Sequence, residues 1–400
     1  MSWHEARIGD LGRVITGKTP PRARPDYFGD EYPFVTPSDF GFMHYYCTDV
    51  AEGVSDLGFE KHKNQTVPRD AAMCVCIGNT IGKCAIASEP CLTNQQINSV
   101  IAGDNSDPKY IYYLLCNIRE QIRAVGLGGG AAQPIINKTK FSNLRVTVPD
   151  LRTQRTIAAT LSAYDDLIEN NRRRIVLLEE TARLLYREWF VHFRFPGHEH
   201  VKITDGLPGG WERTQASSVM DVLSGGTPRT ATAMFWDGEI GFFTPKDATD
   251  TPYVLRTEKT ITEEGLRACN SQLFPQETLF ITARGTVGKL NLALAPMAMN
   301  QSCYGLRTKS HFGQKFLYLA LSAAIEQVRS RATGAVFDAI IVATFDRIPF
   351  IVPPEALTRS FESSITPMFD QIANLIQQNQ KLAQARDLLL PRLMNGEIAL

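Results

Sequence analysis

The sequence lacks an excess of charge of either sign, because 42 lysine and arginine residues are offset by 42 aspartate and glutamate residues. Taken alone, that neutrality argues against a strongly basic nucleic-acid binder. The sequence also lacks any run of about 18 apolar residues, which excludes a membrane-spanning helix. Its first residues show no basic-then-apolar secretion signal. We therefore expect a globular protein of the cytoplasm.

Cysteine pairs at the Cys-x-x-Cys spacing of zinc sites are missing. Six of the eight cysteines lie in the first half of the chain, and we expect all eight to be buried or partly buried thiols in a reducing compartment. The histidine cluster His192, His198 and His200 lies in a stretch that contains glycine and proline. We expect an exposed linker there and no metal site.

Signatures of catalysis are also missing. Residues 78–83 resemble a phosphate-binding loop but are one residue short, and Cys84 stands where serine or threonine is required. The chain has no Gly-x-Ser-x-Gly, no His-Glu-x-x-His and no His-x-Glu followed by Pro-Cys-x-x-Cys. The sequence therefore predicts no catalytic centre, and no cofactor or metal bound to this chain.

What the sequence does contain is an internal repeat. Gly225 of Ser-Gly-Gly-Thr-Pro stands 208 positions after Gly17 of Thr-Gly-Lys-Thr-Pro, and further matches follow in order with small changes of offset. Residues 34–39 align with 242–247, 80–83 with 286–289, 94–95 with 300–301, 120–123 with 326–329, and 141–149 with 345–353. Asp39 and Lys83 recur as Asp247 and Lys289. The chain therefore holds two copies of one module.

Each copy divides into a mixed globular part and a long helix. Residues 72–77 and 278–283 indicate buried strands that lead into a glycine turn. Residues 109–124 and 315–331 indicate amphipathic helices. We expect an α+β fold of two pseudo-symmetric globular domains joined by two long helices. The predicted boundaries are 1–150 and 207–354 for the globular domains, 151–194 for the central helix, 195–206 for a linker, and 355–400 for the C-terminal helix.

The long helices carry apolar residues at alternating steps of four and three, which predicts a coiled-coil seam. The first seam contains Ile157, Leu161, Tyr164, Ile168, Asn171, Ile175, Leu178, Ala182, Leu185 and Trp189; the second contains Phe361, Ile365, Met368, Ile372, Leu375, Asn379, Leu382 and, further on, Leu389. We expect antiparallel pairing, with a buried Asn171 fixing the register. The second helix is expected to start or kink at Pro367. Charged residues off the seam are expected on its solvated face: Glu169, Arg172, Arg173, Glu179 and Glu180.

The ordered motifs resemble the specificity (S) subunit of type I restriction-modification enzymes. They are Gly-x-Thr-Pro, Thr-Pro-x-Asp after an aromatic strand, Gly-Thr-(Ile/Val)-Gly-Lys or its variant Gly-Asn-Thr-Ile-Gly-Lys, and Asn-Gln, each present twice. The helical segment that starts at Gln154, the Leu-Pro-Gly-Gly-Trp-Glu stretch at 207–212 and the ending at 388–398 resemble that family too. As a departure, the second helix lacks the Gln-x-x-Ile start of 154–157.

That resemblance implies two target recognition domains that each read half of a split sequence in double-stranded DNA, with the helices as a spacer. Two methylation (M) subunits would dock on the helical regions, and restriction (R) subunits would complete the complex. S-adenosylmethionine, ATP and Mg²⁺ would be held by those partners. Two alternatives remain open: a coiled-coil scaffold or adaptor without DNA contact, and an enzyme that acts alone. The neutral charge suits a subunit whose partners supply much of the phosphate neutralisation.

The polar turns that recur in both copies are the candidate DNA contacts. Lys83 and Lys289 suit phosphate contacts, and glutamine can pair bidentately with adenine. The candidates are Lys18, Thr36, Ser38, Asn79, Thr80, Lys83, Gln95 and Gln96 in the first copy, and Thr244, Lys246, Arg284, Thr286, Lys289, Gln301 and Ser302 in the second. The seam candidates are the apolar residues and asparagines of the two helices named above.

The two copies differ at these turns. Allowing the glycine turn to slide by one residue, Asn79 aligns with Arg284, while Ser38 aligns with Lys246 and Gln96 with Ser302. Arginine favours guanine and asparagine favours adenine. We therefore predict an asymmetric, bipartite target. A helix of about 36 residues spans about 50 Å, so it could serve half-sites about one DNA turn of 34–36 Å apart.

Overall fold

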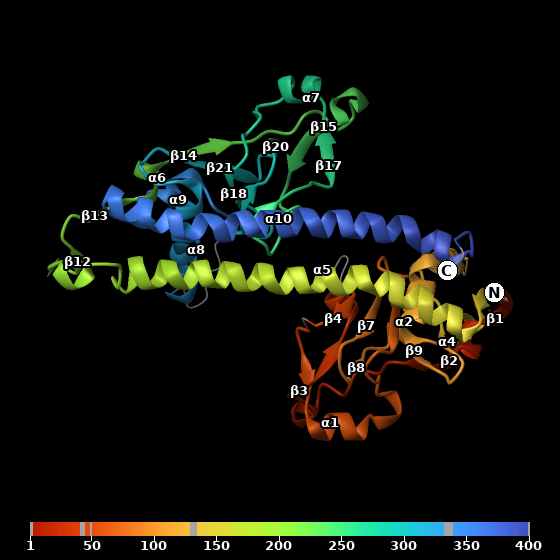
Figure 1. Cartoon of the computed structure of the whole chain (residues 1–400). Helices are drawn as coiled ribbons and strands as arrows, with labels where there is room; N and C mark the ends of the chain where they lie inside the picture. The colour runs from red at the N-terminus through yellow and green to blue at the C-terminus, as the bar shows by residue number, and fades with distance from the viewer. Residues whose placement is uncertain (1–2, 41–44, 49, 129–133, 332–338, 399–400) are drawn as a thin grey trace. The chain divides into compact units, whose positions relative to one another are not determined.

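The computed structural model describes residues 3–40, 45–48, 50–128, 134–331 and 339–398 (Figure 1). The chain forms two compact units: unit 1 consists of residues 1–170 and 379–400, and unit 2 of residues 171–378. Each unit therefore contains one globular part together with a stretch of both long helices.

The sheets of unit 1 have the strand orders β2-β9-β6-β7-β4, β5-β3-β8 and β1-β10. The strands are β1 (Trp3–Arg7), β2 (Gly12–Thr16), β3 (Phe28–Val35), β4 (Tyr46–Cys47), β5 (Gly53–Val54), β6 (Ala72–Val75), β7 (Cys84–Ala87), β8 (Leu92–Thr93), β9 (Ile97–Ala102) and β10 (Arg145–Pro149). The helices α1 (Asp56–Lys61), α2 (Pro108–Asn117), α3 (Arg119–Leu127) and α4 (Lys138–Ser142) connect them.

The corresponding sheets of unit 2 have the orders β14-β21-β18-β19-β16, β17-β15-β20 and β13-β22, with a small pair β11-β12 beside them. The strands are β11 (Ile203–Thr204), β12 (Leu207–Pro208), β13 (Glu212–Gln215), β14 (Met220–Ser224), β15 (Trp236–Phe243), β16 (Tyr253–Val254), β17 (Lys259–Ile261), β18 (Leu279–Thr282), β19 (Leu290–Ala293), β20 (Met297–Met299), β21 (Cys303–Thr308) and β22 (Pro349–Val352). The helices are α6 (Ala216–Val219), α7 (Glu263–Arg267), α8 (Gln314–Arg331) and α9 (Val342–Phe345).

The two units share one topology strand for strand. In each five-stranded sheet the edge strand pairs in parallel, β4 with β7 and β16 with β19, while the other pairs are antiparallel. Even the irregularity of the small sheet recurs, with a register shift between Phe28 and Tyr32 in β3 and between Trp236 and Ile240 in β15. The internal repeat of the sequence is thus a repeat of structure, and the α+β expectation is confirmed.

The predicted local elements are largely confirmed. The buried runs expected at 72–77 and 278–283 form β6 and β18, whose residues are all buried. The predicted helix at 315–331 is α8, but the one at 109–124 is divided at Ile118 into α2 and α3. Pro108 and the Asp107 side chain, which accepts a 2.9 Å hydrogen bond from Tyr110 N, start α2.

The two long helices are α5 (Leu151–Tyr186) and α10 (Glu355–Met394). A π turn at Arg187–Val191 directly follows α5. In unit 1, Leu393 and Met394 pack in one cluster with Ile157 and Leu161, while Asn379 Nδ2 donates to Ile168 O. The residue numbers rise along α5 as they fall along α10, so the helices pair antiparallel, as predicted (Figure 1).

The predicted seam is mostly buried, with two corrections in α10. Ile157, Leu161, Ile168, Asn171, Ile175, Ile372 and Leu375 are at most 3% exposed, and Leu178, Leu185 and Leu389 pack partly buried against the core. Met368 and Leu382 are also partly buried, but their neighbours Phe369 and Ala383 are more deeply buried. These residues follow the 3.6-residue turn of a straight helix, which drifts from a strict 3.5 repeat.

Two further expectations about the helices were wrong. The second helix does not start at Pro367, because α10 runs without a break from Glu355 to Met394. Glu179 is buried rather than on the solvated face, whereas Arg173 and Glu180 are exposed. A buried carboxylate needs partners, and those of Glu179 are described below.

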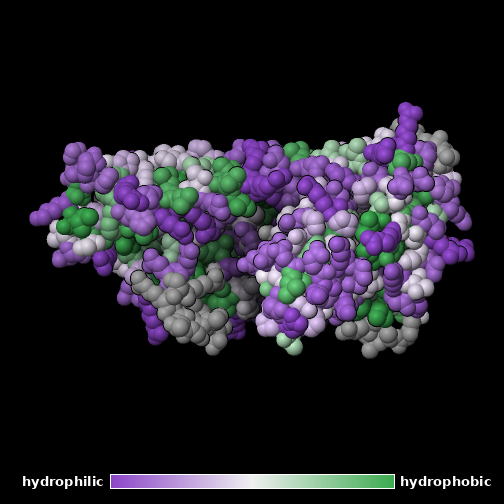
Figure 2. All heavy atoms as spheres, turned by 90° about the horizontal axis from the view of Figure 1, so that it is seen from below, coloured by the Kyte–Doolittle hydropathy of each residue, from purple (hydrophilic) through white to green (hydrophobic). Residues whose placement is uncertain are grey.

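The surface is mostly hydrophilic on the face seen in Figure 2, where hydrophobic side chains form scattered patches. Within the described part of the chain, no helix combines the length and hydropathy that crossing a membrane requires. All eight cysteines are described and none is in a disulfide, in agreement with the prediction of buried or partly buried thiols.

Candidate nucleic-acid interface

The Gly-x-Thr-Pro and Asn-Gln motifs of unit 1 meet in space. The Thr19 hydroxyl donates to Gln95 Oε1 at 2.8 Å. This contact requires Gly17, because a Cβ there would lie 2.2 Å from Asn94 O. The turn that carries Lys18 is thereby held against the turn that carries Gln95, and both of these side chains are exposed.

The Thr-Pro-x-Asp motif of unit 1 is a capping box that stabilises its own turn. The Asp39 carboxylate accepts hydrogen bonds from Thr36 N at 2.7 Å, from the Thr36 hydroxyl at 2.8 Å and from Ala51 N at 3.2 Å. The hydroxyl proton of Thr36 is thus directed into the protein, while its oxygen retains acceptor capacity. Ser38 of the same turn is exposed. The box adjoins the Asn-Gln turn, since Asn94 N donates to Val35 O.

The glycine turn of residues 78–83 completes the cluster. Gly78 and Gly82 have positive φ angles of 86° and 84°, which explains the residue type. Cys76 N donates to Gln96 O at 2.7 Å, so this turn is attached to the Asn-Gln turn. Asn79 is exposed at its tip and Thr80 is partly buried, while Lys83 Nζ lies 3.4 Å from Phe40 O.

Unit 2 builds the same cluster with the same bonds. The Thr227 hydroxyl donates to Gln301 Oε1 at 2.5 Å, and a Cβ at Gly225 would lie 2.5 Å from Asn300 O. The Asp247 carboxylate accepts from Thr244 N at 2.8 Å and from the Thr244 hydroxyl at 2.6 Å. Ala283 N donates to Ser302 O at 2.8 Å, and the Thr286 hydroxyl contacts Pro245 O at 3.4 Å.

These bonds correct the alignment of the glycine turns. Cys76 N and Ala283 N make equivalent bonds, so Arg284 corresponds to Ile77. Asn79 is the additional residue of the longer turn in unit 1. The sequence alignment that paired Asn79 with Arg284 was therefore wrong, although both side chains are exposed at the same turn.

The candidates differ in how freely they can reach a ligand. Those exposed are Lys18, Ser38, Asn79, Gln95, Lys246, Arg284, Thr286 and Gln301; those partly buried are Thr36, Thr80, Lys83, Gln96, Thr244, Lys289 and Ser302. Lys289 Nζ forms an ion pair with Asp250 Oδ1 at 2.6 Å, and the Asp250 side chain is 94% exposed. A phosphate would therefore have to compete with Asp250 for this lysine, whereas the Arg284 guanidinium is exposed beside it.

Sequence reasoning missed the roles of Thr19 and Thr227, whose hydroxyls orient the two exposed glutamines. It also missed the acidic anchors of the helices. In unit 1 the buried Asp165 of α5 accepts a hydrogen bond from Tyr113 OH at 2.5 Å and an ion pair from Arg386 of α10. Burial raises the pKa of the Asp165 carboxyl, although Arg386 and Tyr113 both act to lower it.

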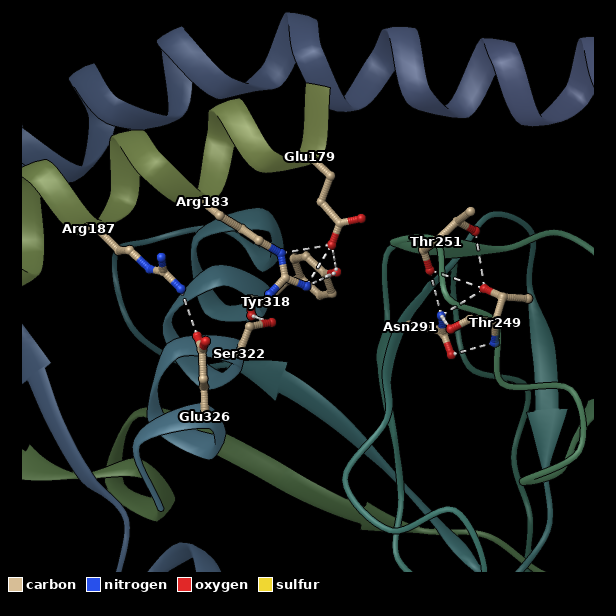
Figure 3. A network of polar contacts seen from close by, with 9 residues as sticks. All are labelled: Glu179, Arg183, Arg187, Thr249, Thr251, Asn291, Tyr318, Ser322 and Glu326. Carbon is tan, nitrogen blue, oxygen red and sulfur yellow. Dashed lines mark hydrogen bonds and ion pairs between the residues drawn. The ribbon is translucent and has the colours of Figure 1, made fainter. Parts of the chain in front are cut away.

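In unit 2 the buried acid of α5 that contacts the globular part is Glu179 (Figure 3). Glu179 Oε1 of α5 accepts from Tyr318 OH of α8 at 2.6 Å and from Arg183 Nη2 at 2.6 Å. Arg187 Nη2 pairs with Glu326 Oε2 at 2.9 Å one turn further along. Each globular part is thus fixed to α5 by a buried acid of α5 and a tyrosine of its own helix, α2 in unit 1 and α8 in unit 2. The one local signal was the four-residue spacing of Glu179 and Arg183.

Comparisons with known proteins agree with this arrangement. The family model described as type I restriction modification DNA specificity domain matches residues 1–180 and again 208–384. The chain is 24% identical over 408 residues to the type I restriction enzyme MjaIX specificity subunit of Methanocaldococcus jannaschii, covering 99% of this chain and 93% of that one. It is 20% identical over 468 residues to the type I restriction enzyme HindI specificity subunit of Haemophilus influenzae, covering 99% of both.

Among solved structures, the chain resembles the S subunit of a type I restriction-modification system from M. genitalium. The TM-score is 0.57 at 14% sequence identity, and the match covers 98% of this chain and 96% of that one. The likeness shows a shared fold of two tandem recognition domains with long helices.

Proposed function

The chain belongs to the type I restriction modification DNA specificity family. On this basis we propose that each of its two recognition domains reads a different part of the DNA target. The chain is a specificity subunit with two tandem target recognition domains. Unit 1 reads one half of a bipartite, asymmetric target in double-stranded DNA, and unit 2 reads the other half. The chain itself carries out no reaction.

One observation carries this proposal: the same hydrogen-bonded turn cluster occurs twice with different exposed residues. The shared bonds, Thr19 to Gln95 and Thr227 to Gln301, hold equivalent turns in equivalent positions. On that common frame unit 1 presents Ser38 and Asn79, and unit 2 presents Lys246 and Arg284. Asparagine can pair with adenine and arginine with guanine in the major groove. Equal frames with unequal side chains support two different half-sites.

The long helices have the properties of a spacer and of a docking surface. They bear large apolar side chains that are exposed, namely Leu167, Val176, Leu177, Leu184 and Leu388. Exposed apolar side chains of this size mark sites of protein contact when they gather on one element. We propose that two methylation subunits dock there, and that restriction subunits join in the complete complex. S-adenosylmethionine, ATP and Mg²⁺ are expected on these partners, and none is expected on this chain.

The scaffold alternative is not favoured, because the match to a DNA specificity family extends over both modules rather than over the helices alone. A scaffold would also have no need of two polar turn clusters held by identical bonds. An enzyme that acts alone is likewise not favoured, since the carboxylates that recur in both clusters, Asp39 and Asp247, are occupied in capping boxes.

The test replaces one exposed residue of each cluster. We expect Arg284→Ala to relax base preference at one position of the half-site that unit 2 reads, by about 1–3 kcal/mol or roughly 5- to 150-fold. Asn79→Ala should act only on the other half-site. The readout is binding of the chain with its methylation subunits to duplexes that carry every base at each target position.

The matched control is Arg267→Ala in α7, which also removes one exposed arginine of unit 2 but lies outside the turn cluster; its guanidinium is paired with Glu263 at 3.8 Å. It should leave base preference unchanged. The proposal would be contradicted if Arg284→Ala or Asn79→Ala relaxed base preference in both half-sites. It would also be contradicted if neither variant changed base preference in any half-site.

A further inference from the structure

Three thiols of unit 1 meet beneath the glycine turn. Cys74 of β6 and Cys84 of β7 lie directly opposite each other in the antiparallel ladder. Cys116 of α2 packs in the same hydrophobic cluster as Cys74 and Cys84, and both of these neighbours influence the Cys84 thiol. Cys84 also follows Lys83 directly, so the thiol lies at the start of the strand that leaves the candidate DNA-contacting turn.

The second unit shows that the fold does not require these thiols. In its ladder the pair that corresponds to Cys74 and Cys84 is Ile281 opposite Leu290. Tyr112 and Cys116 of α2 correspond to Tyr318 and Ser322 of α8 (Figure 3). The Ser322 hydroxyl donates to Tyr318 O at 2.7 Å. Isoleucine, leucine and serine thus fill the same places, so packing alone does not account for three cysteines in contact.

The surroundings of Cys84 favour its thiolate. The neighbouring thiols of Cys116 and Cys74, together with the charge of Arg119, lower the pKa of Cys84 despite its burial. The pKa values of Cys116 and Cys74 are raised, first by a neighbouring thiol, which is Cys84 for Cys116 and Cys76 for Cys74. Arg119 Nε is buried and has no hydrogen-bond partner within the described residues. In unit 2 this arginine is replaced by Ile325.

We propose that Cys84 is a nucleophilic thiol that forms a reversible disulfide with Cys116 when the protein meets a peroxide. The Cys84 sulfur attacks one peroxide oxygen and the O–O bond breaks, giving Cys84 sulfenic acid and one water. The Cys116 sulfur then attacks the Cys84 sulfur, the S–O bond breaks, and a second water leaves. Two thiols are oxidised by two electrons in total and one hydrogen peroxide is reduced to two waters.

Cys116 is the second thiol because of its accessibility. Cys74 is 0% exposed in the middle of the sheet, whereas both Cys84 and Cys116 are only partly buried. The bond would join strand β7 to helix α2, and a thiol reductant would reverse it. The proposal concerns the chemistry of this cluster and does not depend on which DNA the domain reads.

The test oxidises the purified full-length chain with hydrogen peroxide under denaturant-free conditions and maps its peptides by mass spectrometry. We expect a Cys84–Cys116 disulfide that disappears with a reductant. Before oxidation, iodoacetamide at neutral pH should alkylate Cys84 at least about tenfold faster than Cys269, a partly buried thiol of unit 2 that donates to Leu266 O at 3.5 Å.

Two variants copied from unit 2 keep the test decisive even if one of them folds poorly. Cys116→Ser introduces the residue that stands at 322, and should trap the Cys84 sulfenic acid, detected with dimedone. Cys84→Leu introduces the residue that stands at 290, and should leave Cys116 unoxidised at the same peroxide dose. A Cys74–Cys84 disulfide, alkylation of Cys84 no faster than Cys269, or no oxidation of Cys84 would each overturn the proposal.

Discussion

Replacing Asp165 with alanine is expected to lower the free energy of unfolding of unit 1 by about 3–5 kcal/mol. The Asp165 side chain is 1% exposed and its partner on α10, Arg386, is 11% exposed. The variant leaves that guanidinium buried without its main counter-charge, and leaves the Tyr113 hydroxyl without an acceptor. Urea unfolding followed by circular dichroism, together with hydrogen exchange of α2, α5 and α10 amides, measures the loss.

Replacing Asp165, Arg386 and Tyr113 together with apolar residues should change the free energy of unfolding much less than Asp165→Ala does. Burial raises the pKa of Asp165 in spite of its partners, so desolvation of the carboxylate opposes the gain from the ion pair. We expect the triple variant Asp165→Leu, Arg386→Met, Tyr113→Phe to be within about 1–2 kcal/mol of the natural chain. Unit 2 supports this, since apolar Phe369 and Leu319 are buried at the positions that match Asp165 and Tyr113.

The matched control is Asp387→Ala. Asp387 also pairs with Arg386, at 2.7 Å, but its side chain is 60% exposed. An exposed carboxylate contributes about 1 kcal/mol or less. If Asp165→Ala cost no more than this control, the buried pair would not be what holds α5 to α10 in unit 1.

Inserting four residues into α5 after Asn170 is expected to abolish methylation of the natural target and to replace it with one that has a longer unread gap. The helix passes from unit 1 to unit 2 at this point, and α10 passes back after Gln378. Four helical residues add about 6 Å, close to two base-pair steps of about 3.4 Å. Both half-sites should stay as they were, because no turn cluster is altered.

Two companion variants sharpen this experiment. A matched insertion in both helices, after Asn170 and after Gln378, keeps the antiparallel partners in step and should give the same longer gap. The same four residues inserted in the exposed stretch at His198–His200 should leave the gap unchanged. The measurement is sequencing that detects methylated bases in cells that carry each variant with its methylation subunits. An unchanged gap after the helix insertions would show that the helices do not set the spacing.

Much of the fold could be predicted because the duplication repeats its own signals. Two occurrences of Gly-x-Thr-Pro, Thr-Pro-x-Asp and Asn-Gln in the same order indicated two copies of one module, and the periodic helices indicated their pairing. The capping role of Asp39 could also have been predicted, because threonine followed three residues later by an acid is a capping signature. The residues that the two copies share make equivalent hydrogen bonds, as Thr19 to Gln95 and Thr227 to Gln301 do.

The remaining features depend on contacts between residues far apart in the chain. Nothing local marks Asp165 as buried, since its partner Arg386 is 221 residues away. A strict 3.5-residue repeat likewise favoured Met368, whereas packing against the globular part of unit 2 buries Phe369. The equivalence of Arg284 with Ile77 rather than Asn79 required the backbone bonds to Ser302 and Gln96, because a one-residue insertion in a glycine turn can be aligned in two ways.

The central claim is that two recognition domains of one frame read two different half-sites. The most direct measurement is the methylated sequence in the genome of a cell that expresses the chain with its methylation subunits. We predict two unlike short sequences separated by a gap of fixed length and free composition. A palindromic target, or an uninterrupted one, would contradict the account.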